Sequence, residues 1–255
     1  MLDPDRLLAV LRSDVARLAA LPADALDIPV PTCPGWTVTD LLAHLGRVHH
    51  RAVALLEGAP FVPLDDWPPT PEGPPAVAWS REVADELVAA LGRVDPDTPS
   101  RNWVGEVPVS FWLRRMAQET SLHRWDVEQA LGGAATIDAD VGADGVDELL
   151  TWFLPRIPAA DWASVAPSTG PGPDDADQAR TLHLHATDTE GEWMITLDAA
   201  GASVTTGHGK GDAAVRATGE LLELLVWNRA ALDAPGVEVF GDTALAARFL
   251  AVTRF

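Results

Sequence analysis

Hydrophobic residues recur at helical spacing through the first half of the chain. Apolar positions three and four residues apart predict amphipathic helices over 3–20, 39–56, 77–94 and 110–131. Thr37 or Thr39 can cap the second of these helices, and Gly132-Gly133 is a typical glycine end for the fourth. Four such helices predict a bundle, and a further helical pattern over 146–157 closes it or leads out of it.

The hydrophobic period changes from helical to alternating in the second half. Residues 167–177 are rich in Pro, Gly and Asp, which predicts a linker. Beyond it the pattern predicts strands over 181–187, 192–197, 202–206 and 237–240 and helices over 219–231 and 243–252. We therefore expect a two-domain α+β protein, with a four-helix bundle over 1–160 and a small α+β domain with a mainly antiparallel sheet over 178–255.

Composition and charge narrow the class of partner. The chain has 255 residues and a formal net charge of -20, which argues against nucleic acid and anionic membranes as partners. Cys33 is the only cysteine, so no internal disulfide can form, and the chain shows neither a signal peptide nor a spanning apolar run. We expect a cytoplasmic protein, monomeric or homodimeric, that handles a small-molecule substrate.

Three residues of metal-ligating type stand on two predicted helices. Glu119 and His123 are four residues apart, so they share one helical face, and a facing helix that carries His44 would complete a site of two histidines and one carboxylate. Three protein ligands leave positions open for water or substrate, as in catalytic metal sites. Bundles build such sites from inward-facing side chains.

Each of the three also has a structural interpretation. A histidine on an apolar face is often a hydrogen-bonded core residue, and Glu119 with His123 could be a charged pair on one helix. Burying two imidazoles and a carboxylate is costly, however, unless something coordinates or pairs them. That cost favours the metal interpretation when the three are taken together.

Two segments of the chain resemble a known family. Pro31-Thr-Cys-Pro-Gly-Trp-Thr-Val-Thr-Asp-Leu-Leu-Ala-His-Leu and Glu119-Thr-Ser-Leu-His-Arg-Trp-Asp-Val-Glu look like the signature regions of the mycothiol-dependent maleylpyruvate isomerase family. The stretch Gly211-Asp-Ala-Ala-Val-Arg-Ala-Thr-Gly-Glu-Leu-Leu and the following Val237-Glu-Val-Phe-Gly-Asp are similar to that family's second domain. The resemblance implies that the bundle is DinB-like.

The resemblance also implies a site. It suggests a divalent metal, usually zinc, on His44, Glu119 and His123, with mycothiol as the thiol cofactor. Trp36 and Trp125 adjoin the signature segments and are the candidates for lining the cofactor pocket. Arg229 is the candidate catalytic residue, which would meet a carboxylate from the second domain, although a surface arginine at a helix end is an equally simple reading.

The chain departs from relatives that carry a second histidine four residues after the first, because that position is Val48. His49 and His50 are out of phase with His44, so we expect both on the solvent side as non-ligands. Asp126 and Arg124 either orient a ligand histidine or pair with neighbouring side chains, and pairing is slightly favoured.

Two other groups carry weaker signals. Cys33 could be a second thiol near the site, but a packing role in its Pro-Gly-Trp loop is favoured. His183 and His185 alternate on one face of a predicted strand and could bind a second metal together with His208. No acidic or cysteine partner is spaced to support them, so the sequence does not favour that site.

The function expected first is a metal-dependent enzyme in which a low-molecular-weight thiol adds to a small electrophile. The metal would deprotonate the thiol, and either isomerisation or S-transfer could follow. The alternatives are a non-catalytic metal or small-molecule binding module of the same fold and a metal-dependent hydrolase.

Overall fold

A computed structural model of the chain describes residues 1–162, 165, 179–198 and 201–253. It divides into two compact units, Leu2–Thr136 and Ile137–Phe255, and the second also includes Met1. The predicted linker over 167–177 lies outside the described residues. No helix in the described ranges combines the length and the apolar character needed to cross a bilayer.

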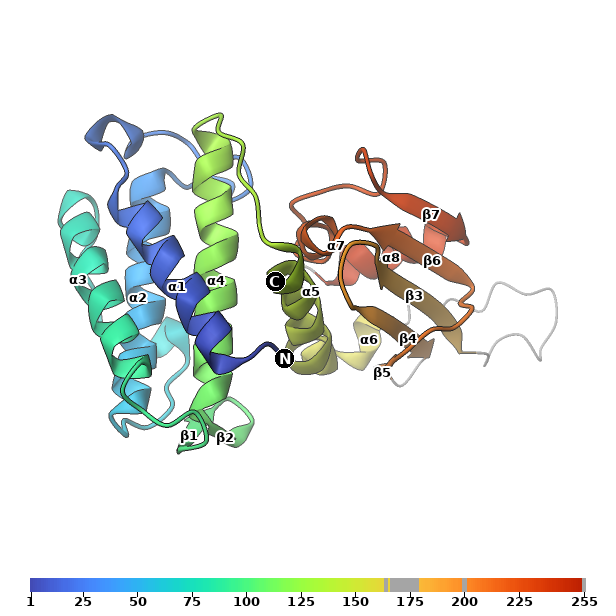
Figure 1. Cartoon of the computed structure of the whole chain (residues 1–255), viewed down its shortest axis with the longest axis horizontal. Helices are drawn as coiled ribbons and strands as arrows, with labels where there is room; N and C mark the ends of the chain where they lie inside the picture. The colour runs from blue at the N-terminus through green and yellow to red at the C-terminus, as the bar shows by residue number, and fades with distance from the viewer. Residues whose placement is uncertain (163–164, 166–178, 199–200, 254–255) are drawn as a thin grey trace. The chain divides into compact units, whose positions relative to one another are not determined.

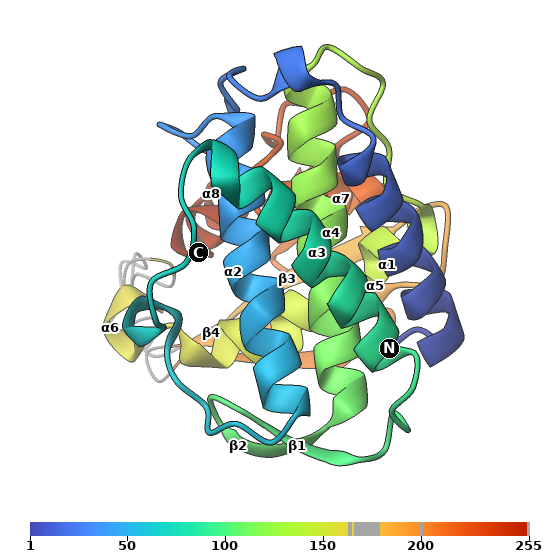
Figure 2. The same cartoon turned by 90° about the vertical axis from the view of Figure 1, so that its left-hand side faces the viewer.

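The first unit is the predicted helical bundle. Its helices are α1 (Pro4–Ala19), α2 (Val38–Leu56), α3 (Pro74–Leu91) and α4 (Val109–Ala130). Helices α1 and α2 each pack against both α3 and α4, and the four lie side by side in both views (Figures 1 and 2). The connections hold two short 3₁₀ turns, η1 (Ala23–Ala25) and η2 (Leu64–Asp66), and a hairpin that the pattern did not predict, β1 (Pro99–Asn102) and β2 (Gly105–Pro108).

Local sequence fixes the ends of the two helices that matter most for the site. Thr37 caps α2, and its side chain and that of Asp40 bond each other's backbone N–H in a capping box. After the C-terminal end of α4, Gly132 has a φ of 73°, and the Gly133 N–H donates to the Glu128 carbonyl at 2.9 Å. A residue with a side chain would be strained at the φ of Gly132, so the predicted glycine end is confirmed.

The second unit is a sheet with helices on one face. Helix α5 (Ala139–Glu148) continues into a π-helical turn, η3 (Leu149–Phe153), a 3₁₀ turn, η4 (Leu154–Arg156), and α6 (Ala159–Trp162). The strands are β3 (Arg180–Ala186), β4 (Glu192–Asp198), β5 (Gly201–Thr206), β6 (Ala213–Ala217) and β7 (Glu238–Gly241), in the sheet order β5-β4-β3-β6-β7. Among the strands of the described ranges, only β3 and β6 pair in parallel, so the expected mainly antiparallel sheet is confirmed.

Strand alternation sets the core of this unit. Leu182 and Leu184 of β3 face a small apolar space that is also lined by residues of α7 (Gly219–Val226) and α8 (Thr243–Val252). Side chains between them on β3 must face the opposite side of the sheet.

Helix α7 ends five residues before its predicted boundary, and Asn228, just beyond it, has a φ of 61°.

Candidate metal centre

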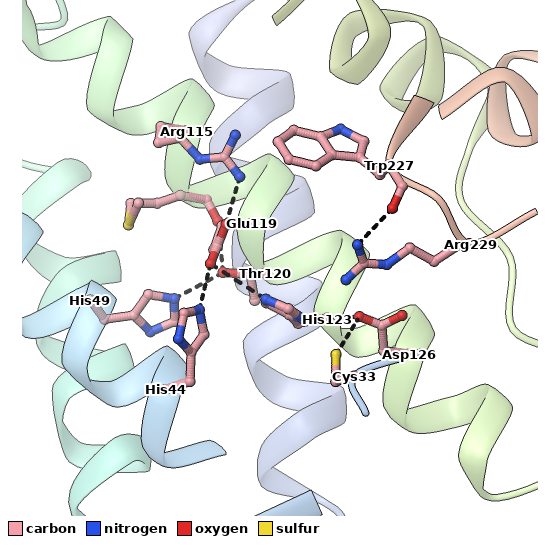
Figure 3. A network of polar contacts seen from close by, with 11 residues as sticks. Cys33, His44, His49, Arg115, Glu119, Thr120, His123, Asp126, Trp227 and Arg229 are labelled. Carbon is pink, nitrogen blue, oxygen red and sulfur yellow. Dashed lines mark hydrogen bonds and ion pairs between the residues drawn. The ribbon is translucent and has the colours of Figure 1, made fainter. Parts of the chain in front are cut away.

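The three predicted ligands converge between α2 and α4. His44 Nε2 lies 2.9 Å from Glu119 Oε1, and His123 Nε2 lies 3.4 Å from the same oxygen. The ligand atoms of all three residues lie within 4.8 Å of one another. Figure 3 shows the three side chains pointing toward one another, His44 from α2 and the other two from α4.

His123 is held in one orientation by Asp126. Its Nδ1 lies 2.9 Å from Asp126 Oδ2, and the Asp126 side chain is fully buried. A carboxylate accepts hydrogen bonds, so Nδ1 carries the proton and Nε2 is left facing Glu119. Asp126 thus pairs with a neighbouring side chain, as the sequence favoured, and its partner is one of the candidate ligand histidines, which such a contact would also orient.

Arg124 does pair with neighbouring side chains. Its guanidinium contacts Asp14 at 3.0 Å and Glu128 at 2.8 Å, away from the three converging residues. The pairing expected for this residue is what the structure shows.

Arg115 fixes the other side of the centre. Its Nη2 lies 2.7 Å from Glu119 Oε2, which leaves Oε1 for the histidines. Burial alone would raise the pKa of Glu119, but the Arg115 charge and the hydrogen bonds from His123 and His44 outweigh it and hold that pKa well below its usual value. Glu119 is therefore ionised, as a ligand carboxylate must be.

The pKa of His123 moves the other way. Burial would lower it, but hydrogen bonds to Asp126, Cys33 and Glu119 and the charge of Glu119 raise it well above the ordinary histidine value. In the absence of a cation, the centre holds a proton instead.

His49 is not on the solvent side, so that expectation is wrong. It is only 2% exposed, because α2 packs against α3 as well as α4 and is buried over two faces. Its Nε2 lies 2.9 Å from Thr120 Oγ1, and the Thr120 hydroxyl donates to the Met116 carbonyl at 2.7 Å. Since that hydroxyl proton is already used, His49 Nε2 must be the donor, and burial, which lowers the pKa of His49 to about 4, keeps the ring neutral at pH 7.

His50 is half-buried rather than solvent-facing. Its Nδ1 accepts a hydrogen bond from Trp67 Nε1 at 3.3 Å, and its ring also contacts Trp79. Neither His49 nor His50 belongs to a cluster of metal-ligating side chains among the described residues.

A pocket of about 390 Å³ opens beside His44. One face of α2 contributes Asp40, His44 and Arg47, and the segment 70–73 forms the opposite wall. Trp36 also lines the pocket, with its ring centroid 5.1 Å from that of His44. Trp125 is buried in the bundle and is not among the residues that line this pocket.

Arg47 is a residue that the sequence did not single out. It is half-buried, and its Nε makes no hydrogen bond within the described part of the chain. Arg47 lies three residues after His44, on the same helical face, and this spacing could have predicted that it lies near the site. An arginine that lines a pocket suits an anionic group such as a carboxylate.

Two further residues that the sequence singled out are Cys33 and Arg229. The Cys33 thiol donates to Asp126 Oδ2 at 3.6 Å, so this cysteine lies beside the centre. It also packs against a hydrophobic cluster that includes Leu41 and Leu45 of α2. Arg229 follows α7 in the second unit, and its Nη1 donates to the Trp227 carbonyl at 2.8 Å.

The donor set fits a divalent transition metal. Two imidazole nitrogens and one ionised carboxylate oxygen are the ligands of catalytic zinc and related ions. Of the three residues, His44 lines the pocket, so a ligand in the pocket would approach the centre from the side of His44.

Comparisons with known proteins identify the family of both parts of the chain. Residues 7–128 match the model of the mycothiol maleylpyruvate isomerase N-terminal domain, and residues 140–248 match that of the MDMPI C-terminal domain. No curated protein sequence shows significant similarity to the chain.

Two solved structures share the fold over most of their length. The crystal structure of the mycothiol-dependent maleylpyruvate isomerase has a TM-score of 0.57 at 16% identity, and that of a histidine-to-alanine mutant of it has a TM-score of 0.62 at 15% identity. Each comparison covers 93% of both chains. The two domain matches together span nearly all of the sequence, and the chain therefore belongs to the mycothiol-dependent maleylpyruvate isomerase family.

Proposed function

We propose that the protein is a metal-dependent enzyme that uses a low-molecular-weight thiol of the mycothiol type on a small, carboxylate-bearing electrophile. The observation that carries the proposal is the convergence of His44 Nε2, Glu119 Oε1 and His123 Nε2 at the edge of a pocket that His44 itself lines. Maleylpyruvate, named in the related structures, is the first substrate to test.

A divalent metal at this centre would supply Lewis-acid stabilisation of a thiolate at neutral pH. That contribution matters because the described residues offer no activated nucleophile in the pocket. The Cys33 thiol donates its hydrogen to the buried Asp126 carboxylate, and Cys33 is not among the residues that line the pocket.

The chain's own residues prepare the centre for this role. Asp126 holds the Nδ1 proton of His123, so that Nε2 offers a lone pair to the metal once it gives up its own proton. Arg115 takes one oxygen of Glu119 and balances its charge. Ligand positions are thus set before any cofactor binds, which limits the reorganisation needed on binding.

Arg47 is proposed to bind a carboxylate of the substrate or thiol. The pocket holds this guanidinium within the same helical face as His44, so the anion would be placed beside the centre. Arg229 is the sequence-derived candidate for the same task and is tested by the same comparison.

The test measures turnover of maleylpyruvate with mycothiol plus zinc, with each alone, and with neither. Turnover only when both are present is expected, and product analysis separates isomerisation from S-transfer. Equal turnover without thiol would replace the proposal with a metal-activated water and a hydrolase. Metal binding without turnover of any electrophile would leave a non-catalytic binding module.

A further inference from the structure

A second group of metal-ligating side chains lies in the other unit, on the sheet face opposite α7 and α8. His183 and His185 of β3 alternate with the core residues Leu182 and Leu184, so both imidazoles lie on the other face. The antiparallel register pairs His185 with Glu192 of β4. Glu192 is the acidic partner that linear spacing did not reveal.

The chain after β5 brings a third histidine to the same place. The Gly207 N–H donates to the Glu192 carbonyl at 3.0 Å, which holds the next residue, His208, beside the Glu192 side chain. His208 Nδ1 lies 2.9 Å from Glu192 Oε2. Three segments of chain therefore meet at one carboxylate.

The distances between the histidine nitrogens and the Glu192 oxygens are close to those between the ligands of a bound metal ion. His183 Nε2 lies 3.3 Å from Glu192 Oε2, and His185 Nδ1 lies 3.5 Å from Glu192 Oε1. One ligand atom from each of the four residues lies within 4.8 Å of every other. Metal–ligand bonds of about 2.0–2.2 Å place tetrahedral ligands about 3.3 Å apart, and the side chain of His208, which is 81% exposed, can rotate to close the difference.

The ring of His183 is buried, and the hydrogen-bonding capacity of its Nε2 is not satisfied. The residue is only 4% exposed, yet its Nε2 makes no hydrogen bond within the described part of the chain, although Glu192 Oε2 lies nearby. A buried ring nitrogen that makes no hydrogen bond is unfavourable and uncommon. The nitrogen points into the cluster, where a cation would use its lone pair.

We propose that His183, His185, Glu192 and His208 form a second metal site, which binds one divalent transition metal of the zinc type. Imidazole ligands favour such ions over magnesium or calcium. Four protein ligands make a closed site, which is typical of structural rather than catalytic metals. The bound ion joins β3, β4 and the chain after β5.

The test uses the full chain, without a histidine tag, in which His44→Ala and His123→Ala remove two ligands of the bundle centre. Zinc is titrated against a chromophoric chelator, thermal unfolding is followed with and without zinc, and Co²⁺ is added to record the visible bands of four-coordinate cobalt. One zinc per chain, a higher Tm with zinc and the cobalt bands are expected.

Two further substitutions locate the binding. Adding Glu192→Gln and His208→Ala should lower zinc affinity at least tenfold and abolish both the Tm shift and the cobalt bands. Both side chains lie at least partly in solvent, so the fold should persist, which circular dichroism checks. Glu190→Gln, an exposed carboxylate two residues from Glu192, is the matched control and should change nothing.

Two results would overturn the proposal. One is the absence of stoichiometric zinc in the protein with only the bundle centre disabled. The other is unchanged affinity after Glu192→Gln and His208→Ala. Neither depends on turnover, so failure of the enzyme assignment would leave this test intact.

Discussion

The side chain of His123 is fixed by Asp126, whose Oδ2 lies 2.9 Å from Nδ1 of the ring. The contact spans one turn of α4, and the carboxylate is fully buried. It determines which nitrogen of His123 faces Glu119, and hence whether the three residues can act as one ligand set.

Replacing Asp126 with Asn should weaken metal binding at the bundle centre by roughly 10-fold to 100-fold, because the ring loses its anionic orienting partner. Chelator competition measures the affinity, in a background carrying Glu192→Gln and His208→Ala so that only one site is counted. Glu128→Gln is the control, since Glu128 lies on the same helix but pairs with Arg17 and Arg124. Equal affinity in the Asp126 and Glu128 variants would contradict the orienting role.

Metal binding should release a proton at neutral pH. The contacts of His123 raise its pKa well above the ordinary value, so the metal-free ring is protonated at pH 7 and must lose that proton to bind a cation. Affinity should fall about tenfold for each pH unit below that pKa. Calorimetry in two buffers of different ionisation enthalpy counts the protons, and a count of zero at pH 7 would refute the linkage.

Arg47→Ala should raise KM at least tenfold with a smaller change in kcat. A charge-assisted hydrogen bond is worth about 1.5–3 kcal/mol, and its loss weakens binding of the carboxylate in ground and transition states alike. Arg93→Ala, at an exposed position, controls for the change in net charge. An unchanged KM for Arg47→Ala with a raised KM for Arg229→Ala would transfer the role to Arg229.

His49 should make the metal-free protein less stable as pH falls from about 6.5 toward 4. Burial lowers its pKa from 6.5 to about 4, so in this range the unfolded chain binds the proton and the folded chain does not. A shift of this size corresponds to about 3 kcal/mol at most. Urea unfolding of wild type and His49→Gln measures the difference, because glutamine can still donate to Thr120. Parallel pH profiles for the two proteins would show that His49 does not cause the loss.

Much of this structure could be predicted because it depends on local patterns. The threonine before α2 and the glycines after α4 determine helix ends through backbone hydrogen bonds, and the four-residue spacing of Glu119 and His123 determines a shared face. The strand β6 was missed because Ala213–Ala217 contains four small or polar residues and only one valine of strong strand preference.

The misses concern contacts between distant segments. The solvent side of α2 could not be identified, since burial of His49 depends on α2 lying against both α3 and α4. Glu192 lies beside His185 only because of the register between β3 and β4. The spacing of residues along one strand does not reveal that register. Arg115 and Asp126 acquire their roles from the position of the ligands they contact.

The central claim is that His44, Glu119 and His123 bind one metal ion. Its most direct test is the metal content of the chain carrying Glu192→Gln and His208→Ala, with and without His123→Ala, after equilibration with zinc and removal of excess. We expect one zinc per chain without the His123 substitution, and at least tenfold weaker binding with it. Full zinc occupancy in the His123→Ala chain would contradict the account.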